Sequence, residues 1–91
     1  MQAPPPVSAD ALRVLGVLLD LDNLRGRELQ WKSGLTDSAK FQAAVAELDR
    51  FDFLQIEGQR STYDDLCGAY IGLRPSAARL AQFLVKSKAT A

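Results

Sequence analysis

The sequence predicts a small, mainly α-helical domain with one β-hairpin, in the order helix, helix, helix, strand, loop, strand, helix. Three observations lead to this prediction. Apolar residues recur at helical spacing from Ser8 to about Leu21 and again after Thr36. After Asp52 the pattern changes to alternating apolar and polar residues, which is typical of strands. Pro75 then stands where it favours the first turn of a last helix.

The length and composition are those of one folded domain. The chain has 91 residues, of which 47% are hydrophobic, and this supplies the apolar area for one modest core. We divide it into a flexible proline-rich N-terminus (1–7), a folded domain (8–86) and a polar tail (87–91). The first residues lack the pattern of a signal peptide, and the apolar segment 14–21 is too short to cross a bilayer. We therefore expect a cytoplasmic protein that does not contact a membrane.

The residue types argue against an enzyme. The chain has no histidine and a single cysteine, Cys67, so the commonest general base and the usual metal ligands are missing. Asp64 and Asp65 are expected on a strand, where neighbouring side chains point to opposite faces, so they form no carboxylate pair. Cys67 is expected to fill space in the same strand. We predict no catalytic residue, no metal site and no cofactor.

The charges balance, with eleven basic and eleven acidic residues. DNA-binding domains are usually basic, because much of their affinity comes from counterions that leave the phosphates. A neutral chain therefore binds DNA only through a local basic patch.

The first helix is capped by Ser8 or Asp10 and is apolar most of the way round. One face carries Leu12, Leu15, Leu18 and Leu19. The apolar surface is widened by Val14, Val17 and Leu21. Such a helix is buried on two sides, and the second side is covered either by the same domain or by a partner subunit.

A short connection and two more helices follow. Residues 23–27 form the connection, with a short strand, and 28–33 form a short helix that ends at Gly34, a residue suited to the left-handed conformation. Thr36 then caps the third helix. The buried positions expected in that helix are Phe41, Ala44, Val45 and Leu48.

The hairpin and the last helix complete the domain. We expect strands at 53–59 and 68–74, antiparallel to each other and joined by a polar loop over residues 58–65. Pro75 occupies the first position of the last helix. The buried face of that helix is expected to contain Ala77, Leu80, Ala81 and Leu84.

Three segments of the chain resemble a known family. The segment 27–36 (RELQWKSGLT) is similar to the helix-turn-helix core of bacterial regulators, in which a glycine turn, a leucine and a capping residue lead into the recognition helix. The segment 47–54 resembles the end of that helix and the start of a wing strand. The segment 73–80 is similar to the part that follows the second wing strand. Together they resemble the MarR-like (multiple-antibiotic-resistance regulator) winged helix-turn-helix domains, over most of residues 8–88.

The resemblance implies a double-stranded DNA-binding module of a small transcription regulator, acting as a homodimer. In such families the third helix lies in the major groove and the wing reaches the backbone or the minor groove. The phosphate contacts would come from Lys32, Lys40, Arg50 and Arg60. The residues placed near DNA on the third helix would also include Ser38 and Gln42.

The third helix also departs from this pattern. Its outward side carries Ala39, Ala43 and Ala46, which donate no hydrogen bond to a base edge, although alanine can touch a thymine methyl group. These alanines form either a plain solvent face or a surface that another helix approaches closely. The same helix carries acidic residues that phosphates repel, namely Asp37, Glu47 and Asp49.

Other departures lie on the second helix and in the wing. Trp31 stands where the family usually has an exposed polar residue, and Gln30 where it often has a small one. Trp31 is either half-buried under the N-terminus or in contact with a partner. Arg60 is either a DNA contact or an ordinary solvated charge. The alternative hypothesis is therefore a winged helix that serves protein interaction or dimerisation, with Trp31 and the three alanines at the interface.

Overall fold

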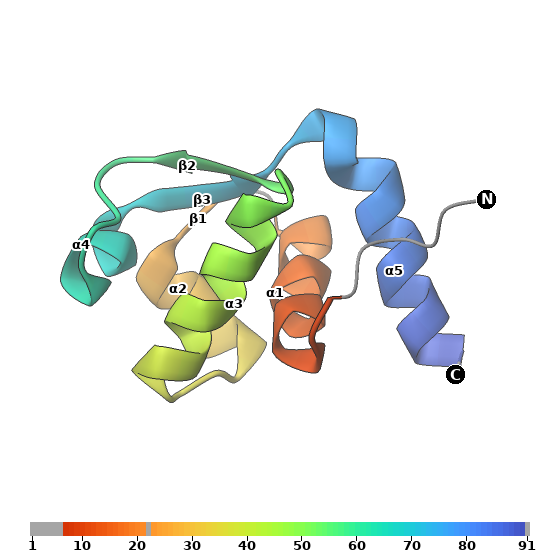
Figure 1. Cartoon of the computed structure of the whole chain (residues 1–91), viewed down its shortest axis with the longest axis horizontal. Coiled ribbons are helices and arrows are strands. Elements are labelled where there is room, and N and C mark those ends of the chain that lie inside the picture. The colour runs from red at the N-terminus through yellow and green to blue at the C-terminus, as the bar shows by residue number, and fades with distance from the viewer. Residues whose placement is uncertain (1–6, 22, 91) are drawn as a thin grey trace.

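The computed structural model describes residues 7–21 and 23–90, so most of the proline-rich segment lies outside the described residues. The helices are α1 (Ala9–Asp20), α2 (Gly26–Ser33), α3 (Ser38–Arg50), α4 (Tyr63–Gly68) and α5 (Ala78–Thr90), with a 3-10 turn, η1, at Pro75–Ala77. The strands are β1 (Leu24–Arg25), β2 (Leu54–Glu57) and β3 (Tyr70–Leu73). Figure 1 shows the strands lying across one end of the α1–α3 bundle. The predicted class, mainly helical with a small sheet, is confirmed.

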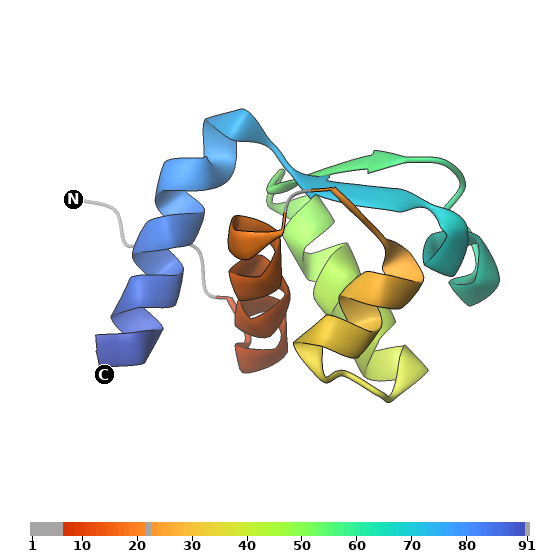
Figure 2. The ribbon, with the colours of Figure 1, turned by 180° about the vertical axis from the view of Figure 1, so that it is seen from behind.

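The first helix occupies the centre of the domain. The hydroxyl of Ser8 caps it by accepting a hydrogen bond from the Ala11 amide at 3.1 Å. Figure 2 shows α1 between α5 on one side and α2 and α3 on the other. Both buried sides of α1 are therefore covered by the same domain, which explains why it is apolar most of the way round.

The second helix starts at Gly26, two residues before the predicted start. The Gly26 amide donates to the carbonyl oxygen of Ala69 at 2.9 Å, which ties the start of α2 to the residue before β3. A Cβ atom at Gly26 would lie 2.0 Å from the carbonyl oxygen of Leu66, so a side chain does not fit there. At the other end Gly34 adopts a φ of 76° and ends α2 as predicted.

The prediction that Thr36 caps α3 is wrong, because the cap is Asp37. The Oδ1 atom of Asp37 accepts hydrogen bonds from the amides of Ala39 at 2.8 Å and Lys40 at 3.2 Å. The Thr36 amide instead donates to the Gly34 carbonyl within the turn. A carboxylate at the N-cap also interacts favourably with the helix dipole. The predicted buried face of α3 is confirmed at Phe41, Ala44, Val45 and Leu48.

The three strands form one antiparallel sheet in the order β1-β3-β2. Gln55 lies opposite Gly72 and Ile56 opposite Ile71, and β1 pairs Leu24 with Ile71 on the other edge. Both hairpin strands are shorter than the predicted ranges 53–59 and 68–74. The chain leaves α3 through Asp52, whose φ is 67°, so the expected break at this residue is confirmed.

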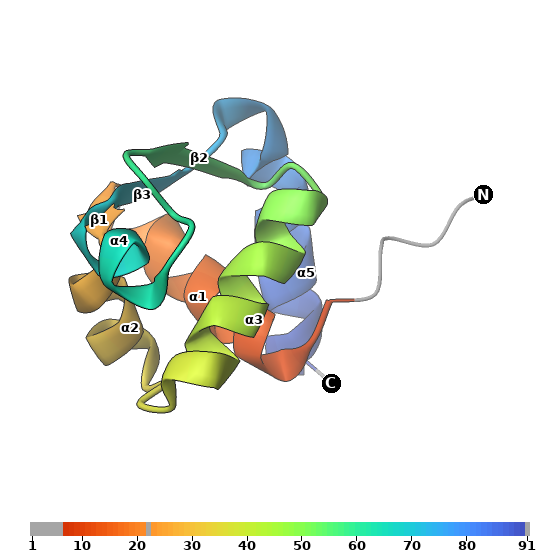
Figure 3. The same ribbon diagram turned by 60° about the vertical axis from the view of Figure 1, so that its left-hand side comes forward.

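The polar loop expected over 58–65 is partly wrong, because residues 63–68 form α4. Thr62 caps this helix by accepting a hydrogen bond from the Asp65 amide at 3.1 Å. Asp64 and Asp65 therefore lie in the first turn of a helix and not on a strand. Cys67 is buried, but on α4 rather than in the second strand. Figure 3 shows α4 below the segment that leaves β2, on the same side of the domain as α2, which it contacts.

The last helix begins as expected, with Pro75 at the first position of η1, which leads into α5. Ala81 is fully buried, and Ala77 and Leu84 are partly buried. Leu80 is 38% exposed, contrary to prediction, and Phe83 is 56% exposed. The buried side of α5 is centred on Ala81 and flanked by Leu84 and Val85, and Leu80 lies about 100° round the helix from Ala81, at the edge of that side. The backbone of α5 stays helical to Thr90.

Candidate nucleic-acid interface

The outward surface of α3 is polar and made of small or flexible side chains. Ala39, Ala43 and Ala46 are exposed, and Ser38, Lys40, Gln42 and Arg50 are exposed on the same helix. The amide of Gln42 donates to the Ser38 carbonyl oxygen at 3.2 Å. The Arg50 guanidinium lies 5.7 Å from the centre of the Phe51 ring. The structure therefore brings together seven of the sequence-predicted site residues on one helix.

The acidic side chains of this helix all have partners within the domain. Asp37 caps the helix through the amides of residues 39 and 40. The Oε2 atom of Glu47 accepts a hydrogen bond from the Ser8 amide at 2.8 Å, which joins the start of α1 to α3. Asp49 forms an ion pair with Arg60, 3.1 Å apart. Only Asp49 is paired with a cation, so its repulsion of a phosphate is reduced, whereas Asp37 and Glu47 keep their negative charge.

Arg60, the basic residue of the wing, is tied to α3 by this ion pair with Asp49. Its side chain is 52% exposed, so water and salt screen the pair, and the guanidinium keeps unused donors. The sequence offered no signal for this contact, because the partners belong to different elements. The positive charge expected at the wing is therefore partly compensated in the free protein.

The wing itself is short because α4 folds back on α2. The hydroxyl of Tyr63 donates to Oε1 of Gln30, and Nε2 of Gln30 donates to the Thr36 carbonyl oxygen at 3.4 Å. Gln30 is buried, and it joins α4 to the turn before α3. This explains a large amide at a position where the family often has a small residue. Only the exposed residues 58–62 remain as the tip of the hairpin.

Among the described residues, Tyr63 has a shifted pKa. Its hydrogen bond with Cys67 and then the loss of solvent around it raise the pKa of Tyr63 above the ordinary value of 10.0. Gln30 and Arg27 lower it, but by less. The phenol is therefore neutral at physiological pH and serves α4 as a hydrogen-bond donor rather than as an acid or base.

The basic and aromatic residues of α2 lie on its exposed face. Trp31 is 78% exposed. The proline-rich segment expected to half-bury it lies outside the described residues. Lys32, the phosphate-contact candidate of this helix, is exposed beside Trp31. The exposed tryptophan is thus on a different helix from the three alanines expected to share its interface.

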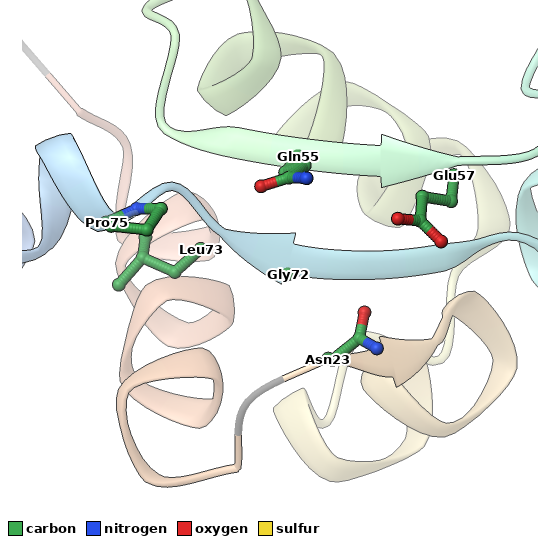
Figure 4. Close-up of a pocket in the computed structure, with 6 residues that line it drawn as sticks. All are labelled: Asn23, Gln55, Glu57, Gly72, Leu73 and Pro75. Atoms are coloured by element: carbon green, nitrogen blue, oxygen red, sulfur yellow. The ribbon is translucent and has the colours of Figure 1, made fainter.

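A polar groove of about 260 Å³ lies on the sheet face turned away from the helices. Figure 4 shows Gln55 and Glu57 of β2 on one side of it and Asn23 on the other, with Gly72 between them. No basic residue lines this groove, which makes it unsuited to a phosphate. Within residues 7–21 and 23–90 there is no group of three or more potential metal ligands. None of the helices described there has the length and apolar character needed to span a bilayer.

Two solved structures resemble this arrangement of elements. A MarR-family transcriptional regulator from Silicibacter pomeroyi superposes with a TM-score of 0.69 at 18% identity, over 89% of this chain and 51% of that chain. The fold is a MarR-like winged helix. Bordetella bronchiseptica BpsR, a protein whose DNA binding is regulated by 6-hydroxynicotinic acid, superposes on the winged helix with a TM-score of 0.70 at 17% identity, over 90% of this chain and 56% of that one.

The winged helix spans about half the length of these two structures. No protein-family model and no curated protein matches the sequence. At this level of identity the likeness shows the fold alone.

Proposed function

We propose that this winged helix is the DNA-binding module of a transcription regulator, with α3 as the helix that enters the major groove. The observation that carries the proposal is the exposed side of α3. Its basic and polar side chains are exposed, whereas each of its three carboxylates has a partner within the domain. Asp49 is neutralised by Arg60, and Asp37 and Glu47 keep their charge but are held by backbone amides, so Lys40 and Arg50 remain exposed to meet phosphates.

The side chains divide between two tasks. Lys40 and Arg50 on α3, with Lys32 on α2, contact phosphates and set the position of the domain on the duplex. Ser38 and Gln42 contact base edges. Ala39, Ala43 and Ala46 let α3 approach the groove floor closely and touch thymine methyl groups. Arg60, at the wing, leaves its ion pair with Asp49 and binds a phosphate of the DNA backbone instead.

The N-terminus of α3 contributes little to phosphate binding in this scheme. The amides of Ala39 and Lys40 are the donors that a helix start usually offers to an anion, and Asp37 already accepts from both. Binding therefore depends on side chains, and we expect a strong dependence on salt concentration. The protein works as a cytoplasmic, non-enzymatic regulator, and as a homodimer it places two α3 helices on successive half-sites.

The proposal is tested by measuring duplex binding. A labelled random-sequence duplex is titrated with the protein at several salt concentrations, and the fluorescence anisotropy is recorded. We expect a dissociation constant of about 10⁻⁴–10⁻⁶ M near physiological salt, as is usual for non-specific binding. Changing Lys40→Ala or Arg50→Ala should each reduce the salt slope by about 0.9. The matched control is Arg79→Ala, an exposed arginine of α5, which should leave the slope unchanged. Equal effects of all three variants, or no salt-dependent binding, would refute the proposal.

A second candidate function, protein interaction or dimerisation, is favoured by the alanines of α3. Ala39, Ala43 and Ala46 recur at spacings of four and three, so a second helix can pack closely along them. This hypothesis predicts an assembly that survives high salt and that Ala43→Arg disrupts in sedimentation experiments. If the wild-type chain stays monomeric at all concentrations and no partner is bound through α3, this alternative fails.

A further inference from the structure

The tryptophan on α2 lies between two hollows. Trp31 is the only tryptophan of the chain and is largely exposed. One exposed aromatic residue needs no explanation by itself. This one, however, has a hollow of about 460 Å³ on the side of the turn, lined by Arg27, Gln30, Trp31 and Thr36. A second hollow, of about 440 Å³, is lined by Arg27, Glu28, Trp31 and Lys32.

The lining of both hollows is mainly apolar, and the charges beside them are mostly positive. Most of the surface in each hollow belongs to carbon atoms. Arg27 and Lys32 form no ion pair with any of the residues 7–21 and 23–90. Glu28 is the one acidic residue among those that line the hollows. An aromatic centre flanked by arginine and lysine has the composition of a binding hot spot.

We propose that Arg27, Trp31 and Lys32 form a docking surface for an acidic segment of a partner protein. The segment places an apolar or aromatic side chain against the indole of Trp31. Its carboxylates pair with the guanidinium of Arg27 and the ammonium of Lys32. The surface shares Lys32 with the phosphate contacts proposed above, but Arg27, Trp31 and the two hollows lie outside those contacts, so the inference goes beyond the proposed function.

Charge and hollow shape favour a peptide over a nucleic acid as the occupant. A nucleic acid would bring a phosphate with every nucleotide, whereas the hollows offer two cations, one carboxylate and a mainly apolar lining. A peptide can alternate carboxylates with apolar side chains. It can thus match two separated cations and a mainly apolar lining at the same time.

The position of the surface suits contact with a partner while the domain is on DNA. Thr36 lines the first hollow and is directly followed by Asp37, the cap of α3. Gln30 lines the same hollow and joins α2 to α4 through Tyr63. A partner seated beside Trp31 therefore contacts residues that set the start of the recognition helix.

Selection of a phage-displayed random peptide library on the whole chain tests the proposal, with the Trp31→Ala variant used to remove unrelated binders. We expect enriched peptides in which aspartate or glutamate flanks leucine, phenylalanine or tryptophan. Synthetic peptides of these sequences that lack tryptophan should shift the emission of Trp31 to shorter wavelength, because the indole loses water. Labelled versions should bind roughly tenfold or more weakly to Trp31→Ala.

Charge-reversal variants and matched controls decide the chemistry. Arg27→Glu and Lys32→Glu should each weaken binding, and more so at low salt. Arg79→Glu and Phe83→Ala, which change an exposed arginine and an exposed phenylalanine of α5, should not. Retained circular dichroism confirms that each variant is folded.

Three outcomes would overturn the inference. The first is a selection that enriches nothing over the Trp31→Ala counter-selection, or that enriches basic or uncharged peptides. The second is binding that Arg27→Glu and Lys32→Glu leave unchanged. The third is complete displacement of the peptide by a duplex oligonucleotide whose own affinity falls with Trp31→Ala, because the surface would then belong to nucleic acid. If α3 does not bind duplex DNA, peptide binding at Trp31 can still be measured, so the two proposals can fail independently.

Discussion

The substitution Gly26→Ala tests whether α4 is really docked on α2. The added Cβ atom would lie 2.0 Å from the carbonyl oxygen of Leu66 and 3.1 Å from Cα of Cys67. Because Cβ atoms essentially never approach a neighbour within 3.0 Å, the two backbones must separate by 3.0 − 2.0 = 1.0 Å. The atom in the way belongs to the backbone, so no side-chain rotation relieves the clash.

The expected cost combines three contributions. Overpacking of this kind costs about 1–3 kcal/mol. Separation of the backbones also weakens the 2.9 Å hydrogen bond from the Gly26 amide to the Ala69 carbonyl. That bond contributes about 1 kcal/mol. Alanine recovers up to about 1 kcal/mol of helix propensity. The net loss is about 1–3 kcal/mol, which lowers the melting temperature by about 4–24 °C in a domain of this size.

Urea unfolding followed by far-ultraviolet circular dichroism measures this change, since the exposed Trp31 is a poor reporter of the core. The matched control is Gly16→Ala in α1, where an added Cβ meets nothing within 4 Å. That variant should gain up to about 1 kcal/mol from helix propensity. If Gly26→Ala were as stable as the wild type while Gly16→Ala behaved as expected, α4 would not lie on α2 and the short wing would be wrong.

Three further predictions concern the cap, the wing and the tyrosine. Asp37→Ala should cost about 1 kcal/mol of unfolding free energy, whereas Thr36→Ala should cost much less, and equal losses in urea unfolding would contradict the assignment of the cap. Asp49→Asn releases Arg60 and should tighten duplex binding more than Asp20→Asn, a charge change at the end of α1; anisotropy titrations showing the same gain for both would contradict a role for the pair. Tyr63→Phe should make the free energy of unfolding fall less steeply as the pH rises above 10. The pKa of Tyr63 is raised in the folded state, so its contribution is fully present below pH 10.0 and is lost as the pH rises through the folded value. Unfolding curves of the variant and the wild type that fall equally above pH 10 would contradict this.

Elements with long periodic patterns could be predicted from the sequence, whereas short elements built by tertiary contacts could not. Phe41, Val45 and Leu48 repeat at helical spacing over about two turns, so the pattern alone identifies α3 and its buried face. Helix α4 has six residues and too few turns for a period to show. It is stabilised by its contact with Gly26 and by the hydrogen bond from Tyr63 to Gln30, and both join residues distant in sequence.

Local signals also failed where two neighbouring residues could do the same task. Thr36 and Asp37 are both good N-caps, and the choice between them depends on the turn at Gly34, which places the carboxylate over the first amides of α3. In the last helix the burial of Ala81 followed from its spacing. The exposure of Leu80 did not, because the spacing alone does not show on which side of Ala81 the packed face extends, and it extends toward Val85.

The candidate site could be located from the sequence, but its electrostatics could not. The exposed positions of α3 follow from the helical wheel, and all of those named are exposed. The engagement of Glu47 by Ser8 and of Asp49 by Arg60 joins different elements, so no spacing in the sequence reveals it. The first contact fixes the position of the Glu47 carboxylate without removing its charge, and the second neutralises Asp49.

The most direct test of DNA binding by α3 is a map of amide chemical shifts during titration with a duplex at low salt. We expect the largest chemical-shift changes at residues 38–50 and smaller changes at the hairpin tip, residues 58–62. Changes concentrated on α5, or no changes at any duplex concentration, would contradict DNA binding by α3.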